Sequence, residues 1–331
     1  MPVALLAAFA ISAPTFRLET TKNGNVDLVH AGKRLPVQPY RKTAVARWSG
    51  TILTGTGSQL IYDAKGKVQT FDLAKELETW LEDDDLWGGR ANANNQRYTA
   101  MRGGGFVEEV TDLLPQTDGS ALGVLTLRVG FMSGEPFGPQ LLFRFRPKGN
   151  HLEPLRVFSG YGGPENGRSP SRIFRAGQRQ WIQDVDLYEL TPIGALGKRV
   201  AKLPQYTVSL ALSAQRWIVT QTWSRANGGR SYDAIDTRTG KITPLHRPSP
   251  GNGEGTSMMD ASEEAPYILL LTESGEQRSI QTVRIPDGKR TKIDGRAGFL
   301  WGDYAIGITD KVEVWSAANG KPLASLAWPA K

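Results

Sequence analysis

The stretch Tyr232-Asp-Ala-Ile-Asp236-Thr-Arg-Thr-Gly240-Lys241-Ile242 contains the pattern that decides the fold. Apolar side chains alternate with polar ones before the turn, and such alternation buries one face of a β-strand. Gly240 supplies the positive φ angle that a tight hairpin requires, and Lys241 opens a second strand. The stretch therefore predicts a β-hairpin that reverses at a Gly-Lys turn.

The same hairpin frame recurs along the chain. Four further copies are Val26–Leu35 with Gly32-Lys33, Leu60–Val68 with Gly66-Lys67, Thr282–Lys289 with Gly288-Lys289, and Val312–Leu323 with Gly320-Lys321. A degenerate copy runs from Val185 to Val200 and places its turn at Gly197-Lys198. One hairpin is only marginally stable in water, so repeated copies must stack against one another.

The spacing of the turns predicts a β-propeller. Most intervals fall near the period of about 40 to 45 residues that is typical of propeller repeats. The interval from Gly66 to Gly197 is much longer, and we assign it to one oversized blade with strands at 106–110, 122–129, 141–145 and 152–158. We therefore expect an all-β fold in which residues 1–331 form one propeller of about seven four-stranded blades. Two ordinary blades in the long interval would give eight.

Composition narrows the chemistry. The chain has no cysteine, which excludes disulfides, cysteine-ligated zinc, iron–sulfur clusters and a thiol nucleophile. A net charge of +7 is small for this length, so we expect no nucleic-acid partner. No apolar run is long enough for a transmembrane span, and we expect a monomer.

The N-terminal segment Val3–Ala13 is apolar and allows two interpretations. It is similar to the apolar part of a secretory signal, although no Lys or Arg precedes it. It is equally compatible with the innermost strand of the first blade. The sequence therefore does not decide between a secreted or periplasmic location and a cytoplasmic one.

One insertion interrupts the repeat between the second and third blades, at residues 72–97. Within Asp72–Leu81 the apolar residues share one helical face, and Asp72 is suited to cap the helix, so we predict a short helix. The acidic residues that follow, Asp83, Asp84 and Asp85, offer the oxygen ligands that calcium prefers. The spacing of a calcium loop is missing, and a solvated acidic loop is the alternative. We predict no other cofactor.

Two features of the chain favour ligand binding. Trp87 lies between the acidic run and a Gly-Gly pair, where it would form part of a recognition surface. A basic region between 144 and 179 contains the candidate anion ligands Arg144, Arg146, Arg168, Arg172 and Arg175. The alternative for Phe143-Arg-Phe-Arg146 is a strand whose arginines simply face solvent.

Catalytic motifs are few. His30, His151 and His246 share no metal-ligand spacing, and the chain contains no Gly-x-Ser-x-Gly nucleophile elbow. Without a tertiary structure, no pair of carboxylates can be placed at acid/base distance.

The frame resembles the repeats of the WD40-like and PQQ-like propeller superfamily, best over Ala234–Lys241 and Val312–Lys321. The resemblance concerns architecture and implies no single activity. We therefore expect a non-enzymatic binding or scaffold protein that presents a loop rim to a protein or an anionic ligand. The alternative is a propeller enzyme, a lactonase-like hydrolase or a quinone-dependent dehydrogenase, with arginine and carboxylate groups at the channel mouth.

Overall fold

The structure is a computed structural model of the chain. It describes residues 15–22, 24–37, 47–48, 51–56, 59–64, 67–72, 76, 79–80, 82–83, 86, 106–128, 131–132, 135–136, 140–146, 151–158, 172–204, 207–224, 229–248 and 255–329. The segment Val3–Ala13 lies outside these residues, so neither interpretation of it is tested.

The described residues form sheets that follow one another in chain order, and neighbouring strands pair antiparallel. The first has three strands, β1 (Arg17–Thr20), β2 (Val26–His30) and β3 (Lys33–Val37). The next two have four strands each, β4 (Arg47–Trp48), β5 (Thr51–Thr56), β6 (Gln59–Ala64) and β7 (Lys67–Asp72), then β8 (Phe106–Pro115), β9 (Ala121–Arg128), β12 (Gln140–Arg146) and β13 (His151–Val157). A small hairpin of β10 (Phe131–Met132) and β11 (Glu135–Pro136) stands between β9 and β12.

Four more four-stranded sheets complete the series. They are β14 (Arg172–Ala176), β15 (Arg179–Asp184), β16 (Asp186–Leu190) and β17 (Leu196–Ala201); β18 (Thr207–Ser213), β19 (Trp217–Ser224), β20 (Gly229–Asp236) and β21 (Ile242–His246); β22 (Gly255–Ala261), β23 (Tyr267–Ser274), β24 (Gln277–Arg284) and β25 (Lys289–Ile293); and β26 (Phe299–Trp301), β27 (Tyr304–Ile308), β28 (Lys311–Ser316) and β29 (Pro322–Ala327).

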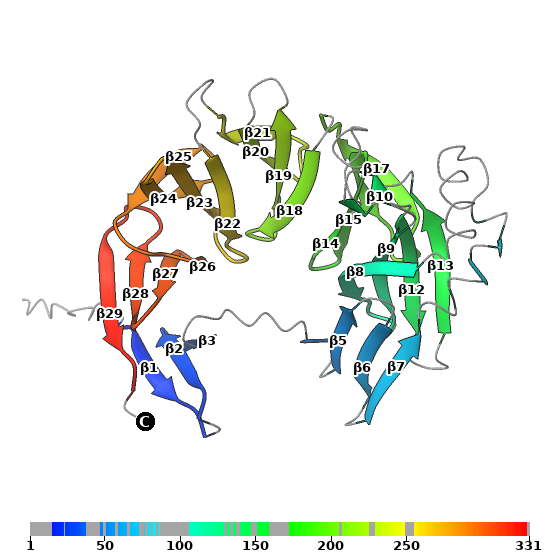
Figure 1. Cartoon of the computed structure of the whole chain (residues 1–331), viewed down its shortest axis with the longest axis horizontal. Helices are drawn as coiled ribbons and strands as arrows, with labels where there is room; N and C mark the ends of the chain where they lie inside the picture. Colours follow the sequence, from blue (N-terminus) through cyan, green and yellow to red (C-terminus); the bar gives the residue numbers. More distant parts are fainter. Residues whose placement is uncertain are drawn as a thin grey trace, which may run out of the picture.

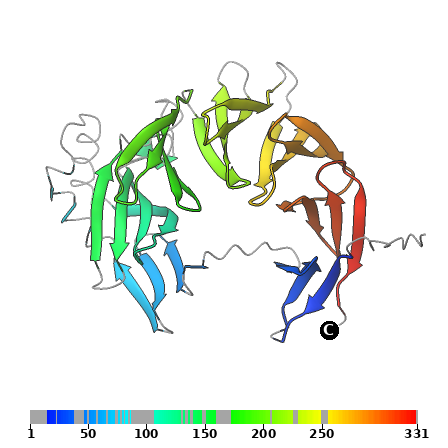
Figure 2. The ribbon, with the colours of Figure 1, turned by 180° about the vertical axis from the view of Figure 1, so that it is seen from behind.

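This arrangement is a β-propeller. The sheets stand as blades along an arc, with β14, β18, β22 and β26 on its inner side and β17, β21, β25 and β29 on its outer side (Figure 1). The view from behind shows the same arc (Figure 2). Within the described residues there are six four-stranded blades, and the three-stranded sheet β1–β3 stands beside the last of them. The predicted all-β propeller is confirmed, and so are the four strands of the oversized blade, which are β8, β9, β12 and β13.

The Gly-Lys turns form as predicted in the last three blades. Gly240, Gly288 and Gly320 all have positive φ angles, of 73°, 68° and 71°. The Gly240 amide donates to the Asp236 carbonyl oxygen at 2.7 Å, and the Asp236 amide donates to the carbonyl oxygen of Lys241 at 2.9 Å. The turn glycine is therefore needed for its backbone angle.

The predicted turn at Gly197 is wrong. Gly197 lies inside β17, and the turn glycine is Gly194, with a φ of 84°. Its amide donates to the carbonyl oxygen of Thr191 at 2.9 Å. Pro192 explains the shift, because a proline lacks the amide hydrogen that a strand needs and its fixed φ angle favours the start of a turn.

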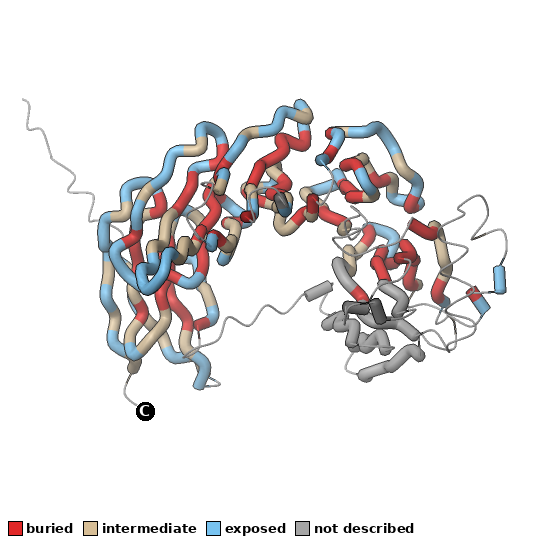
Figure 3. Tube along the Cα trace, turned by 45° about the horizontal axis from the view of Figure 1, so that its top comes forward, coloured by how far each residue is buried: buried red, intermediate tan, exposed pale blue. Residues whose placement is uncertain are grey.

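The hydrophobic core is divided among the seams between successive blades. One cluster joins Phe174 and Trp181 of one blade to Ile218 and Ile235 of the next, and another joins the blade β22–β25 to Trp315. Buried residues run along the strands while exposed residues gather at the turns (Figure 3). Trp181 and Trp315, which are 1% and 3% exposed, pack between blades in these clusters.

The sheet β1–β3 packs against the last blade. Leu28 and Val37 share a cluster with Phe299, Ile306, Val312 and Val314. His30 lies in the same seam, where its Nε2 is 2.9 Å from the Tyr304 hydroxyl and its ring stacks on Phe16 with 3.9 Å between centroids. The first and last parts of the chain are therefore held together by apolar packing and by one buried histidine.

The insertion contains the predicted helix, as far as its residues are described. Glu76, Thr79, Trp80 and Glu82 are helical, and Trp80 is 4% exposed. No helix in the described part of the chain is both long enough and apolar enough to cross a membrane.

Candidate functional site

The predicted arginine ligands that the structure describes, Arg144, Arg146, Arg172 and Arg175, each contact groups of their own surroundings. Arg144 is 8% exposed and donates from a terminal guanidinium nitrogen to the Pro192 carbonyl oxygen at 2.6 Å. The expectation that it faces solvent is wrong, because Arg144 shares a strand face with Leu142, which is buried in the seam with the next blade. Arg146 pairs with Glu153 at 2.7 Å.

The other arginines of this region also contact their own surroundings. Arg175 donates to the carbonyl oxygens of Gly177, at 2.9 Å, and Pro115. The Arg172 guanidinium lies 5.7 Å from the centre of the Phe174 ring. Arg168 lies outside the described residues. The prediction that these cations bind an anion stays untested.

The acidic insertion is described only in part. Asp83 accepts a hydrogen bond from the Leu86 amide at 3.1 Å, as a helix-capping aspartate does. Asp84, Asp85 and Trp87 lie outside the described residues. In the part of the chain that is described, no three histidine or acidic side chains cluster in a way that would hold a metal ion.

A groove of about 710 Å³ lies between the blade β22–β25 and the connection Asp294–Gly298, which leads to the last blade. Its floor is a row of apolar side chains that crosses the blade, since Leu271 pairs with Ile280 and Ile280 pairs with Ile293 in the strand register. Directly paired residues on adjacent strands point to the same face of a sheet. The alternation of each strand therefore builds one continuous apolar floor.

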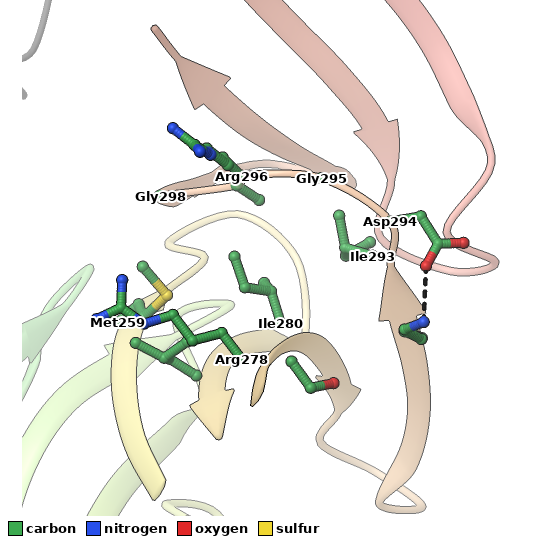
Figure 4. Close-up of a pocket in the computed structure, with 12 residues that line it drawn as sticks. Met259, Arg278, Ile280, Ile293, Asp294, Gly295, Arg296 and Gly298 are labelled. Carbon is green, nitrogen blue, oxygen red and sulfur yellow. Dashed lines mark ion pairs between the residues drawn. The ribbon is translucent and has the colours of Figure 1, made fainter. Parts of the chain in front are cut away.

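A β-bulge adds the fourth apolar residue. The register of β22 against β23 shifts between Met258 and Asp260, so Met259 is the extra residue. Met259 is 38% exposed and lies beside Arg278, across from the segment Asp294–Gly298 (Figure 4). A flexible thioether at this position adapts to ligands of different shape.

The wall of the groove is the segment Asp294–Gly298, which leads from β25 to β26. A Cβ atom at Gly295 would lie 2.1 Å from the Trp315 ring, and one at Gly307 would lie 2.6 Å from the Arg296 carbonyl oxygen. These two positions must therefore be glycine for the segment to lie flat on the last blade. The Gly298 amide fixes its end by donating to the Ile306 carbonyl oxygen at 2.8 Å.

Three cations line the groove. Arg278 pairs with Glu273 at 2.8 Å and Lys292 pairs with Asp294 at 3.0 Å. Arg296 is exposed and has neither an ion pair nor a side-chain hydrogen bond with any residue that the structure describes. Within the described part of the chain, the groove therefore combines an apolar floor with one positive charge that has no ionic partner, a combination that suits a ligand with an anionic and an apolar part.

Sequence reasoning missed this groove. Asp294-Gly-Arg-Ala-Gly298 has the composition of a connecting turn and matches no binding motif. The one available signal was an arginine between two glycines at the end of a repeat, where the strand pattern stops. The row Leu271, Ile280 and Ile293 is visible only once the strand register is known.

Comparisons with known proteins bear on the fold alone. No family model matches the chain, and no curated protein matches it significantly. Solved structures similar to it include a chain of a nidogen/laminin complex, at 10% identity and a TM-score of 0.38 over 84% of this chain and 94% of that one. BamB from Moraxella catarrhalis is similar at 14% identity and a TM-score of 0.30, over 67% of this chain and 80% of that one.

An acylaminoacyl peptidase is similar at 9% identity and a TM-score of 0.46, over 95% of this chain but only 50% of that protein. Identities and scores of this size do not transfer a ligand or an activity. Function has to be argued from the groove.

Proposed function

We propose that the protein is a non-enzymatic binding propeller whose groove between β22–β25 and Asp294–Gly298 takes a ligand with an anionic group next to an apolar one. The observation that carries the proposal is Arg296, an exposed cation without an ionic partner among the described residues, on the wall of a groove with an apolar floor. An unpaired guanidinium gains from a carboxylate or phosphate because both donor and acceptor are charged.

The size and rigidity of the groove support binding. Its volume of about 710 Å³ lies within the range of roughly 300 to 1,000 Å³ that is usual for ligand sites. Its wall is fixed against Trp315, so little conformational freedom is lost on binding. The resemblance to WD40-like and PQQ-like repeats, the arginines between 144 and 179, and a calcium ion at Asp83–Asp85 stay separate predictions.

The test is a set of simple amphiphiles measured by isothermal titration calorimetry. Decanoate should bind, whereas decyltrimethylammonium, with the same chain length and the opposite charge, should not. Arg296→Glu should weaken decanoate binding by about tenfold or more, which corresponds to about 1.4 kcal/mol. Arg238→Glu changes the same charge on an exposed turn outside the groove and should have no effect.

A second variant tests the floor without changing the charge. A Cβ atom at Gly298 would meet open space, and its φ is not in the left-handed region, so Gly298→Trp adds a bulky side chain at the edge of the groove without backbone strain. It should abolish decanoate binding while the unfolding midpoint stays at the wild-type value. Equal binding by the wild type and by a folded Gly298→Trp variant would refute the proposal.

A further inference from the structure

We propose that two copies of this chain pair edge to edge through β29, antiparallel about a twofold axis at Ser325, so that their last blades form one continuous sheet. The proposal concerns the outer edge of the last blade. It does not depend on the groove, whose lining residues do not include Ser325. The monomer expected from the sequence stays untested, and this inference departs from it.

The outer edge of β29 is open and accessible in the part of the chain that the structure describes. There β29 pairs only with β28 and ends the sheet of the last blade. It lies on the outer side of the arc of blades (Figure 1). Ser325 and Ala327 are exposed, and Leu323 is 43% exposed. A second strand can therefore reach this edge without displacing a buried side chain.

The main chain of Ser325 faces this open edge. The Ser316 amide donates to the Lys321 carbonyl oxygen at 2.9 Å, so the main chain of Ser316 faces β29. Backbone groups alternate in direction along a strand, so Val314 also faces β29, where it pairs with Ala324. The amide and carbonyl groups of the next residue, Ser325, therefore point away from β28 and are placed to bond an added strand.

The sequence of β29 lacks the residues that usually protect an open edge. Natural edge strands carry charged side chains or prolines that prevent pairing with another chain. The last strand of each other blade, and of the sheet β1–β3, has such a residue: Lys33 in β3, Lys67 in β7, Pro154 in β13, Lys198 in β17, Pro244 in β21 and Arg290 in β25. In contrast, β29 has no charge, and its one proline is its first residue, Pro322.

The order of side chains in β29 favours a second copy of the chain as the occupant. In an antiparallel pair centred on Ser325, Leu323 lies opposite Ala327 of the second copy, and Ala324 lies opposite Leu326 of the second copy. A large side chain thus meets a small one at each of these positions, which is the arrangement that packs best. The two Ser325 hydroxyls meet at the axis, where they can share a hydrogen bond. The strand is therefore complementary to itself, as a twofold contact requires.

Charge and apolar packing support the same pairing. A strand such as β25 would set its lysines and arginine against those of its own copy, and like charges opposite each other destabilise a sheet. Pairing through β29 avoids this. Ala324 and Leu326 also pack on the apolar cluster at the seam with the first sheet, so the paired strands extend that cluster. One short strand buries less than the roughly 1,200 to 2,000 Å² of a stable interface, so we expect a weak dimer, with a Kd of about 10 to 100 µM.

The experiment is sedimentation velocity of the full-length protein over a range of concentrations, which should show a monomer–dimer equilibrium. Ser325→Lys and Ser325→Glu each place two like charges together at the axis, and each should weaken dimerisation by about tenfold or more. An equimolar mixture of the two variants places Lys against Glu and should dimerise about as well as the wild type. Ala318→Lys adds the same charge on the exposed turn before β29, outside the paired residues, and should have no effect.

A single cysteine tests the register of the pair. The chain contains no cysteine, so Ser325→Cys introduces one thiol per copy. Directly opposite residues of an antiparallel pair have Cα atoms about 5.5 Å apart or less, which a disulfide can bridge. With oxidised glutathione as the oxidant, Ser325→Cys should form a disulfide-linked dimer, whereas Ala318→Cys should not.

Three results would overturn the inference. The first is a wild-type protein that stays monomeric at about 1 mM, well above the expected Kd. The second is a mixture of Ser325→Lys and Ser325→Glu that stays monomeric although both variants unfold at the wild-type midpoint, together with no disulfide in Ser325→Cys. The third is a monomeric protein that binds a labelled peptide with the sequence of β29, because the occupant of the edge is then a strand of another protein and not a second copy.

Discussion

Gly240, in the turn between β20 and β21, lies directly against the carbonyl oxygen of Val200 in the outer strand of the preceding blade, and a Cβ atom at Gly240 would stand 2.3 Å from that oxygen. Gly288 and Gly320 lie in the same way against the carbonyl oxygens of Pro244 and Lys292. The turn that identifies the repeat therefore also joins each of these blades to the one before it.

This contact predicts a difference between two glycine substitutions. Gly240→Ala adds a backbone clash to the cost of a positive φ angle, and should lower the free energy of unfolding by roughly 3 kcal/mol. Gly275→Ala, at a φ of 58° with open space around it, should cost only about 1 kcal/mol. Urea unfolding followed by tryptophan fluorescence measures both. Equal losses would show that the seam contact does not contribute.

Removing the single buried glutamine Gln183 should cost more stability than removing the hydrogen-bonded pair Gln116 and Gln180 together. Gln183 is fully buried, donates to the carbonyl oxygen of Thr207 at 2.7 Å, and accepts from the amide of Ser209 at 2.6 Å, so it joins β15 to the inner strand of the next blade. Gln183→Met leaves two buried backbone groups unpaired and should cost about 2 to 4 kcal/mol in unfolding free energy.

The control for this substitution is the amide pair Gln116 and Gln180, whose side chains hydrogen bond to each other at 2.6 and 3.2 Å. The double variant Gln116→Met/Gln180→Met removes both partners of this pair together. It leaves one carbonyl oxygen, that of Leu114, without the hydrogen bond that it accepts from Gln116 at 3.0 Å, and should still cost less than Gln183→Met, which leaves two buried backbone groups unpaired. Thermal unfolding of the two variants provides the comparison. A larger loss for the double variant would contradict the argument.

Asp236 should make the fold sensitive to acid. The Arg216 guanidinium bonds both of its carboxylate oxygens, at 2.6 and 3.1 Å, and lowers the pKa of Asp236 from 3.8 to about 2. Because the folded state holds the charged form, this stabilisation is complete above about pH 4 and disappears as the pH falls toward 2. Asp236→Asn should lose on the order of 2 kcal/mol at pH 7.

The loss from Asp236→Asn should be much smaller when unfolding is measured near pH 2, where about half of the Asp236 carboxylates are protonated in the folded state. Asp287 also has its pKa lowered to about 2, by the hydrogen bond from Arg284, but this pair is exposed. Asp287→Asn should therefore have a much smaller effect, one that decreases further with added salt. A pH-independent loss for Asp236→Asn would disprove the role of its charge.

His30 should weaken the seam between the first sheet and the last blade in acid. Burial lowers the pKa of His30 from 6.5, so the folded state favours the neutral ring. Protonation of the unfolded state then destabilises the seam as the pH falls below about 6.5, and stability is greatest above it. Hydrogen exchange of β2, corrected for intrinsic rates, should accelerate between pH 7 and 5.

His30→Gln should remove this pH dependence, although it lowers the protection of β2 at every pH through loss of the ring stacking on Phe16. His151 is exposed, and His151→Gln should leave the exchange profile unchanged. If His30→Gln retained the wild-type pH profile, another group would be responsible.

The alternation of apolar residues and the recurring turn glycines predicted the propeller because both are local properties. Strand burial and a positive φ angle are decided within about ten residues, as in Tyr232–Ile242. The four strands of the oversized blade followed from the same local rules. The wrong turn at Gly197 arose because two glycines, Gly194 and Gly197, lie within one connection, and only the pairing of β16 with β17 selects between them.

The sequence by itself thus determined the class of fold and the places where its repeat is interrupted. Tertiary structure alone decided the groove, because its floor depends on strand register and its wall depends on the contact of Gly295 with Trp315, 20 residues away along the chain and in the next blade. It also separated Arg144, which is buried against Pro192, from Arg296, which has no ionic partner among the described residues. The sequence does not distinguish one arginine from another. Only the neighbours that folding brings to each guanidinium decide whether it already has a hydrogen-bond or ionic partner.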